Sequence, residues 1–446
     1  MTETPNYDNE YDAIVVGAGP AGSAAALTMA KQDLDVIMIE RGAYPGAKNV
    51  FGGVLFTPTI RELVDDFSEA PVERYVAEKK FSMLSNEDET ALSMKPGSWH
   101  EEPHNDSFTI LRGDFDEWFA DQAVEAGATL ITETTVLDVI REGDDEHSQI
   151  IGVETDRPDG RLLAPVTVLA EGANSLVSEG AGLKETSDAK DVAVAAKEVR
   201  KYDRDTIEER FNLHDEDGVA YHYFGEGAVP EGFGGAYIYT NKRTISIGLA
   251  YSISDARSNP KKPDEILNEF KNHPAVAPLV RGGRLIEYSA HAIPEGGYDD
   301  VPDLVHNGAV LVGDTAGLVL NNGVHLEGTN MAAESGYHAA NAIADAIDRG
   351  RADEAALSQY PEDLENSFVM QNLENYSWFQ DLIGQEEEFL FEKLPTAIAE
   401  AEKEYFRMDK EPKESHAKKA KDIVLQAAGG YIGAAKRAWK FRRLLS

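Results

Sequence analysis

The chain has 446 residues, of which 80 are Asp or Glu and 42 are Lys or Arg, so its net charge at pH 7 is −38. With 42% hydrophobic residues, it has the composition of a folded protein of two or three packed units, which excludes a disordered chain. It contains no cysteine, which excludes disulfides, a thiol nucleophile and a cysteine-held zinc site or iron–sulfur cluster in this chain.

The acidic residues are spread along the chain and predict a solvated, repulsive surface. At about 1 M salt the Debye length falls to about 3 Å, which removes most of that repulsion. The composition therefore predicts a protein of a halophile. A net acidic surface also argues against a nucleic-acid partner. The sequence shows neither an apolar run of about 18 residues nor a signal-peptide pattern, so we expect a cytoplasmic protein, with or without attachment to the cytoplasmic face of the membrane.

The N-terminal region reads as strand, helix, strand. Residues 12–16 and 35–40 are short apolar runs, and residues 20–31 are Ala-rich. Between the first strand and the helix, three glycines follow the dinucleotide-binding pattern, in which Gly17 allows the tight turn, Gly19 lets a pyrophosphate approach and Gly22 lets helix and strand pack closely. Glu40 ends the second strand, 18 residues after Gly22, where an acid can hold ribose hydroxyls.

Three later segments likewise contain a strand end or a turn at which a cofactor could bind. They are Arg112–Asp116, which leads into a helix, Val168–Ser175, an apolar strand that enters a turn of small residues, and Val310–Gly317, a strand that ends in Gly-Asp. These segments resemble the successive motifs of FAD proteins of the glutathione-reductase-like, p-hydroxybenzoate-hydroxylase-like class. FAD is the cofactor that the resemblance implies.

A closer resemblance is carried by the segments 40–50, 239–242, 291–298 and 327–330. With them, the chain resembles FixC and the electron-transfer flavoprotein:quinone oxidoreductases over about residues 11–348. The resemblance implies an FAD-dependent oxidoreductase that accepts electrons from a FixA/FixB-like electron-transfer flavoprotein and passes them to a ferredoxin-like partner, to quinone, or to both. Because the chain has no cysteine, it is more similar to the FixC type, whose cluster is carried by a separate ferredoxin-like FixX subunit.

The resemblance also implies which residues contact FAD, and none of them is a side-chain nucleophile, because the flavin performs the redox chemistry. The residues expected at the cofactor are Gly17, Gly19, Pro20, Ala21, Gly22, Glu40, Arg41, Lys48, Asn49, Gly53, Arg112, Val136, Gly172, Asp314, Gly328, Thr329 and Asn330. Asp314 would anchor the ribityl chain, and residues 328–330 would bring a helix N-terminus to the flavin. We expect no metal: the string His100–His104 has the spacing of a zinc-protease motif, but Pro103 would break the helix that this chemistry requires.

The expected fold class is mixed α/β, with a Rossmann-like FAD-binding domain, an inserted antiparallel-sheet domain and a helical C-terminus. We expect the discontinuous FAD-binding domain to comprise residues 8–85, 106–182 and 305–350. The sheet-rich domain on the substrate or quinone side would comprise residues 86–105 and 183–304, and the helical region residues 351–446.

The last 31 residues, 416–446, depart from the acidic composition, with eight Lys or Arg against one Asp. An apolar stripe at helical spacing runs through them, and Gly429-Gly430 is predicted to divide two helices. This tail fits either a helix that docks on a membrane surface or a partner, or a helix packed on the acidic body with its cations facing carboxylates.

Three other functions remain open. A geranylgeranyl-reductase-type FAD enzyme that reduces prenyl chains shares the early motifs, but residues 237–242 lack the aromatic string typical of that family. A flavin monooxygenase would need direct reduction by NAD(P)H, for which no second dinucleotide motif is evident. A flavin-binding scaffold without catalysis is the third.

Overall fold

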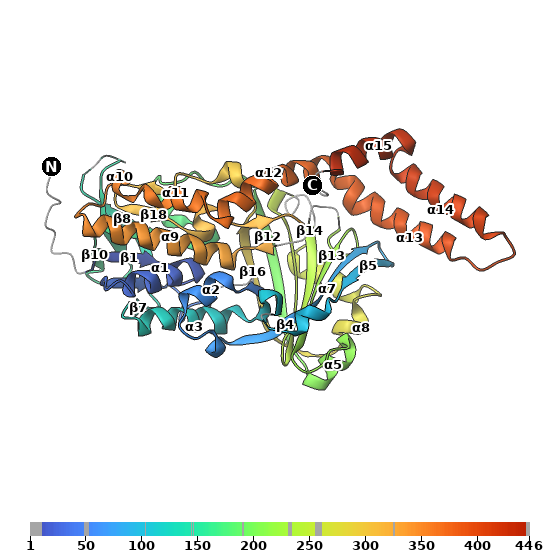
Figure 1. Ribbon diagram of the computed structural model, residues 1–446, viewed down its shortest axis with the longest axis horizontal. Helices are drawn as coiled ribbons and strands as arrows, with labels where there is room; N and C mark the ends of the chain where they lie inside the picture. The colour runs from blue at the N-terminus through green and yellow to red at the C-terminus, as the bar shows by residue number, and fades with distance from the viewer. Residues whose placement is uncertain are drawn as a thin grey trace. The chain divides into compact units, whose positions relative to one another are not determined.

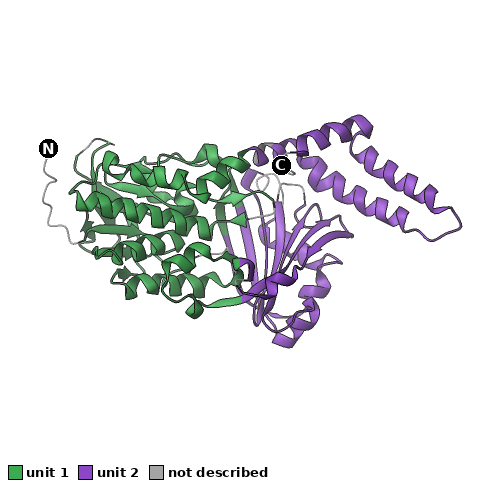
Figure 2. Cartoon of the chain, in the orientation of Figure 1, with its two compact units in different colours: residues 1–73, 106–193, 291–377 green, residues 74–105, 194–290, 378–446 purple. Residues whose placement is uncertain are grey.

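The computed structural model describes residues 11–48, 53–102, 104–143, 145, 147–189, 191–230, 234–254, 261–323 and 326–442. The chain forms two compact units, which Figure 2 colours separately. Unit 1 comprises residues 1–73, 106–193 and 291–377, and unit 2 comprises residues 74–105, 194–290 and 378–446.

Unit 1 is built on a six-stranded sheet of the order β17-β18-β11-β1-β2-β7. Its strands are β1 (Ala13–Val16), β2 (Val36–Ile39), β7 (Thr129–Ile131), β11 (Val166–Leu169), β17 (Val305–His306) and β18 (Ala309–Leu311). All neighbouring pairs are parallel except β17–β18, and β1 lies between β2 and β11, with Val15 opposite both Met38 and Val168. The apolar runs of β1, β2 and β11 are buried along their whole length, as expected of parallel strands covered on both faces.

Three helices pack together in unit 1: α1 (Pro20–Ala30), α3 (Arg112–Glu125) and α9 (Thr329–Asp348). Every residue of α1 is buried, because this Ala-rich helix contacts β1 and β2 as well as α3 and α9. The α1–α9 contact is very close: a Cβ on Gly336 would lie 2.2 Å from the carbonyl oxygen of Ala21. Figure 1 shows α1 and α9 side by side.

The remaining elements of unit 1 surround this centre. The antiparallel sheet β10-β9-β8 contacts β11 through β9, and β3 pairs antiparallel with β6. The bounds are β3 (Val54–Phe56), β6 (Ser107–Ile110), β8 (Val136–Arg141), β9 (Ile150–Thr155), β10 (Arg161–Leu163), β19 (Leu320–Asn321), β20 (Leu326–Glu327), α2 (Pro58–Leu63), α4 (Leu176–Gly180), α10 (Glu354–Leu357) and α11 (Gln359–Glu365).

Unit 2 contains consecutive sheet strands in the order β16-β12-β15-β14-β13-β4, and β5 pairs with β4. The bounds are β4 (Val72–Leu84), β5 (Glu89–Met94), β12 (Val192–Lys201), β13 (Asp217–Phe224), β14 (Gly234–Thr240), β15 (Thr244–Ser252), β16 (Arg284–Pro294), α5 (Arg204–Phe211), α7 (Pro263–Asn272) and α8 (Ala277–Val280). The strands predicted at 236–239 and 244–251 are therefore confirmed as β14 and β15.

The C-terminal part of unit 2 is helical. Its helices are α12 (Phe368–Glu387, which begins in unit 1), a π-helical segment (Glu388–Lys393), α13 (Leu394–Tyr405), α14 (Lys413–Ala427) and α15 (Gly430–Lys440). Gly429, between α14 and α15, and Gly430, the first residue of α15, both have positive φ angles, of +77° and +74°. The predicted division of the tail at these two glycines is confirmed.

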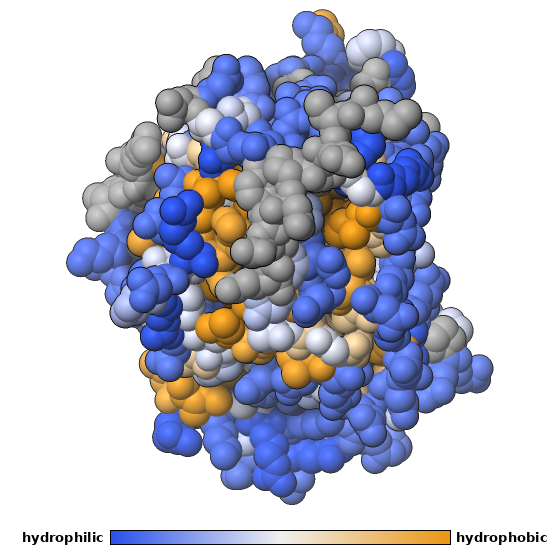
Figure 3. All heavy atoms as spheres, turned by 90° about the vertical axis from the view of Figure 1, so that its left-hand side faces the viewer, coloured by the Kyte–Doolittle hydropathy of each residue, from blue (hydrophilic) through white to orange (hydrophobic). Residues whose placement is uncertain are grey.

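The mixed α/β fold with a parallel sheet, antiparallel sheets and a helical C-terminus is confirmed. Hydrophilic residues cover most of the molecular face in Figure 3, in keeping with the acidic composition, and apolar residues gather toward its middle.

Candidate functional site

The turn between β1 and α1 leaves no room for side chains at Gly17 and Gly22 and is open at Gly19. Gly17 has a φ of +102°, and a Cβ there would lie 2.3 Å from the carbonyl oxygen of Ala170. A Cβ on Gly22 would lie 1.9 Å from the carbonyl oxygen of Gly17, whereas one on Gly19 would meet no atom within 4 Å. No side chain caps α1 at Gly19, and Pro20 begins the helix. The open position and the helix N-terminus fit a pyrophosphate.

Glu40 holds this turn from the end of β2. Its two carboxylate oxygens accept hydrogen bonds from the backbone N–H of Gly42 at 2.6 Å and of Ala18 at 3.1 Å. The carboxylate is thus fixed beside the glycine turn with lone pairs to spare, as a ribose-binding acid must be. The following residue, Arg41, is exposed.

Arg112 interacts electrostatically with Asp314 and is held by a third residue, Asp116, to which the sequence assigned no role. Arg112, at the start of α3, donates two hydrogen bonds to the fully buried Asp116, from Nε at 2.6 Å and from a terminal nitrogen at 2.7 Å. Burial raises the pKa of Asp314, and the Arg112 guanidinium partly offsets that rise. Gly46, with a φ of +86°, packs against Arg112 and Asp116, since its Cβ would lie 2.8 Å from the Arg112 carbonyl oxygen and 2.9 Å from the Asp116 Cβ.

The N-terminus of α9 is held at the same edge as that of α1. The Gly313 N–H, at the end of β18, donates to Ser335 Oγ at 2.9 Å, and a Gly313 Cβ would lie 2.8 Å from the Ala21 Cβ. Gly328 precedes α9 without a side-chain cap, and the Asn330 amide donates to Glu327 at 2.8 Å. Gly328, Thr329 and Asn330 therefore stand at an uncapped helix start.

The other predicted residues are placed as follows. Gly172 has a φ of +74° and open space on its Cβ side, Val136 is buried in β8, and Gly53 is buried before β3. Lys48 is exposed, and Asn49 lies outside the described residues.

Lys184 was missed by sequence reasoning. Its Nζ donates to the carbonyl oxygen of Thr315 at 3.1 Å and to Ser175 Oγ at 3.4 Å, so it joins the turns that follow β11 and β18. Burial lowers its pKa. Because Lys184 is a single lysine in a polar segment, no pattern in the sequence indicates that it bridges these two turns.

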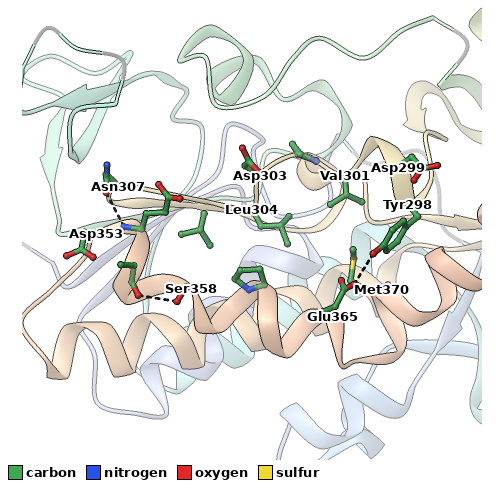
Figure 4. A pocket seen from close by; sticks show the side chains of 15 residues that line it. Tyr298, Asp299, Val301, Asp303, Leu304, Asn307, Asp353, Ser358, Glu365 and Met370 are labelled. Atoms are coloured by element: carbon green, nitrogen blue, oxygen red, sulfur yellow. Dashed lines mark hydrogen bonds between the residues drawn. The ribbon is translucent and has the colours of Figure 1, made fainter.

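A surface groove of about 870 Å³ opens elsewhere in unit 1, along the edge strand β17 and helices α10 and α11 (Figure 4). Carboxylates line it, among them Asp299, Asp303, Asp353 and Glu365. Their negative charge opposes phosphate binding, so the groove does not suit the phosphates of a dinucleotide.

The zinc-protease string does not form a metal site. His100 ends one 3-10 turn and His104 begins another, and His100 lies 3.1 Å from Asp217 while His104 stacks on Tyr75. Over the part of the chain that the structure describes, no group of three or more metal-ligating side chains gathers.

These residues fit FAD: two uncapped helix starts and the glycine turn between β1 and α1 for the phosphates, Glu40 for the ribose, and Asp314 with Arg112 beyond them. Residues 12–216 match the FAD dependent oxidoreductase family. A geranylgeranyl bacteriochlorophyll reductase-like protein from Thermoplasma acidophilum shares the fold, with a TM-score of 0.68 and 20% identity over 96% of this chain and 98% of that one. The fold and the site thus define an FAD-dependent oxidoreductase.

Similar proteins of known name indicate the family within this class. The chain is 41% identical to protein FixC of Bradyrhizobium diazoefficiens, over 97% of this chain and all of the relative, and 40% identical to protein FixC of Azorhizobium caulinodans over the same shares. Residues 382–445 match the ETF-QO/FixC family C-terminal domain. The chain belongs to the FixC family, which confirms the resemblance and the FAD cofactor.

Helices that could span a membrane are absent from the described ranges. The cations of the tail face carboxylates in part: Arg437 and Lys440 both contact Glu386, at 2.8 and 2.5 Å. Three large apolar side chains of α15 are exposed to solvent: Tyr431 is 70%, Ile432 75% and Trp439 66% exposed.

Proposed function

We propose that this chain accepts electrons from a FixA/FixB-like electron-transfer flavoprotein onto its FAD and passes them to quinone, with a ferredoxin-like FixX subunit as the partner that carries an iron–sulfur cluster. The observation that carries the proposal is the likeness to FixC over 97% of a chain that has no cysteine. A cysteine-held cluster on this route therefore has to reside on another chain.

FAD, when bound, supplies the electron transfer. The α1 start would hold the pyrophosphate and Glu40 the ribose. Arg112 and Asp314 would bind the middle of the cofactor, with the Arg112 guanidinium fixed by Asp116. The α9 start, from Gly328, would place its positive dipole end where negative charge gathers on the reduced ring. On this account unit 1 carries the cofactor.

The donor is tested by anaerobic reduction of the purified protein in molar KCl, followed through its visible flavin spectrum. Reduced electron-transfer flavoprotein is offered in one cuvette and NADPH in another. We expect bleaching by the flavoprotein and none by NADPH on the same time scale. Fast bleaching by NADPH alone would contradict the proposal. It would favour a prenyl reductase, the kind of enzyme after which the Thermoplasma protein of similar fold is named, or a monooxygenase.

We also propose that α15 docks the protein on the membrane, where a lipid-soluble quinone resides. Tyr431, Ile432 and Trp439 give α15 exposed aromatic and aliphatic side chains, and the Arg442 guanidinium lies 3.8 Å from the centre of the Trp439 ring. Salt at about 1 M screens the remaining cations of the tail, and Arg437 and Lys440 are bound to Glu386, so apolar insertion has to supply more of the affinity than charge does.

Vesicle flotation in molar KCl tests this docking with the double variant Tyr431→Ser, Trp439→Ser. Leu176→Ser is the matched control, since Leu176 is 68% exposed on α4 in unit 1. We expect flotation of the wild type and the control and loss of flotation for the double variant. Equal flotation of all three, or loss of FixX binding without any change in flotation, would contradict membrane docking by α15.

A further inference from the structure

Glu295 lies in the segment 291–298, which carries part of the family likeness but has no role in holding FAD so far. It directly follows β16, and its backbone N–H donates to the carbonyl oxygen of Asp191 at 2.7 Å. Its carboxyl accepts a hydrogen bond from the Asn321 amide at 3.1 Å. The backbone and the side chain of Glu295 are thus both fixed, each by a different part of unit 1.

Asn321 connects this carboxyl to two of the segments assigned to FAD, those of Asp314 and Gly328. It lies in β19, which begins three residues after Gly317, the residue with a φ of +71° that ends the Asp314 turn. β19 pairs antiparallel with β20, with Leu320 opposite Glu327. β20 leads directly to Gly328 and the uncapped start of α9. Glu295 is therefore hydrogen-bonded to the hairpin that joins two of the segments assigned to FAD.

The surroundings of the Glu295 carboxyl favour its protonated form. Burial raises the pKa of Glu295 to about 7, and the Asn321 hydrogen bond partly opposes the rise. Four residues earlier, burial lowers the pKa of His291, and the nearby cations Arg41 and Arg112 lower it further. Both effects favour the neutral form of His291, so Glu295 is the remaining acid of this segment.

Other charged groups lie close to these elements. Glu327, in β20, accepts a hydrogen bond from Asn330, and Asp300 lies beside Gly296, whose Cβ would come within 2.7 Å of the Asp300 Cβ. Asp191 meets the Glu295 backbone through its carbonyl oxygen.

We propose that Glu295 exchanges the proton that accompanies two-electron reduction of the bound flavin. Once the FAD of the family takes up two electrons from a reduced flavoprotein donor, the Glu295 O–H bond would break, its proton would move to the flavin, and the carboxylate would remain. When the two electrons leave to a quinone, which takes them with two protons from solvent to become the hydroquinone, the flavin proton would return to the Glu295 carboxylate. The proposal rests on the FAD of the family and deepens the proposed function.

The test is the midpoint potential of the bound flavin as a function of pH, measured by anaerobic spectroelectrochemistry with mediators and no protein donor. In the wild type, the slope of potential against pH should change near pH 7, because a group that titrates there is linked to the electron pair. Glu295→Gln should lose that change of slope while it retains FAD. Asn321→Ala removes a hydrogen bond that lowers the pKa of Glu295, so the change of slope should move to higher pH.

Glu125→Gln serves as the matched control, since Glu125 is exposed at the end of α3 and should behave as the wild type does. Redox-difference infrared spectra give a second readout: a protonated-carboxyl band that shifts in deuterium oxide should be present in the wild type and absent in Glu295→Gln. An unchanged slope profile or an unchanged band in Glu295→Gln would overturn the proposal. If that variant cannot hold FAD, an unmoved profile in Asn321→Ala would do so.

The experiment separates the two claims. If the potentials behave as expected but reduced electron-transfer flavoprotein does not bleach the protein, the proposed donor is wrong and the role of Glu295 stands. If the flavoprotein bleaches the protein and Glu295→Gln has the same profile of potential against pH as the wild type, only the proposed proton role of Glu295 is wrong.

Discussion

Gly336→Ala adds one methyl group at the closest contact between α1 and α9. Its Cβ would lie 2.2 Å from the Ala21 carbonyl oxygen and 3.1 Å from the Ala25 nitrogen, whereas ordinary contact begins at 3.4 Å. The atoms met are backbone, so the helices have to separate by about 1 Å. Overpacking of this kind costs about 1–3 kcal/mol, and alanine in a helix recovers about 1 kcal/mol relative to glycine. With rigid backbone on both sides, we expect the upper end, a net loss of about 2 kcal/mol.

The same separation moves the two helix starts that would hold FAD, so the affinity for FAD should fall about tenfold or more, which is about 1.4 kcal/mol. Gly384→Ala is the control, because Gly384 is an exposed position in α12 whose Cβ would meet no atom within 4 Å. Urea unfolding in molar KCl should show a stability loss for Gly336→Ala and a gain of up to about 1 kcal/mol for Gly384→Ala. FAD titration by fluorescence quenching gives the affinity. A Gly336→Ala protein as stable as the wild type, with the same FAD affinity, would refute the reasoning.

Three further predictions follow from the same structure. Gly17→Ala should abolish FAD binding, because φ is +102° and its Cβ would lie 2.3 Å from the Ala170 carbonyl oxygen; a variant that purifies with stoichiometric flavin would contradict this. His416 is buried with its ring nitrogens 2.9 Å from Glu404 and from Asp409, which raise its pKa. The protonated His416 ring stabilises the α13–α14 pair through these two contacts. This stabilisation is complete below the pKa of His416 in the unfolded chain, about 6.5, and is lost as pH rises through its raised pKa in the folded protein. Hydrogen exchange of α14 should therefore speed up over that range beyond the intrinsic increase, and His416→Asn should remove the excess. Finally, the net charge of −38 predicts that the urea midpoint rises from dilute buffer to molar KCl, and a midpoint that is independent of salt would count against a halophilic origin.

The parts of the fold that the sequence predicted well are those fixed by neighbouring residues. The β1–α1–β2 unit follows from apolar runs around Gly17 and Gly22, where any side chain would collide with backbone. The division of the tail at Gly429-Gly430 is equally local, since both residues adopt positive φ.

Contacts between distant segments carried no such signal. Asp116 holds Arg112, and although it lies in a segment that was singled out, its carboxylate looks like any other in a chain with 80 acids. The Glu295–Asn321 hydrogen bond joins residues 26 positions apart, and no short-range pattern connects them. In the tail, the apolar stripe at helical spacing predicted the helices. The salt bridge from Arg437 to Glu386, 51 residues away, could not be predicted because it depends on how α12 and α15 pack.

The central claim is that this chain carries electrons from a flavoprotein to quinone through its FAD. The most direct measurement supplies reduced electron-transfer flavoprotein and a water-soluble quinone analogue under anaerobic conditions in molar KCl, with this protein as the variable component. The account predicts hydroquinone formation at a rate proportional to the amount of this protein, and none with Gly17→Ala. Bleaching of the flavin without hydroquinone, or hydroquinone at the same rate with Gly17→Ala, would contradict it.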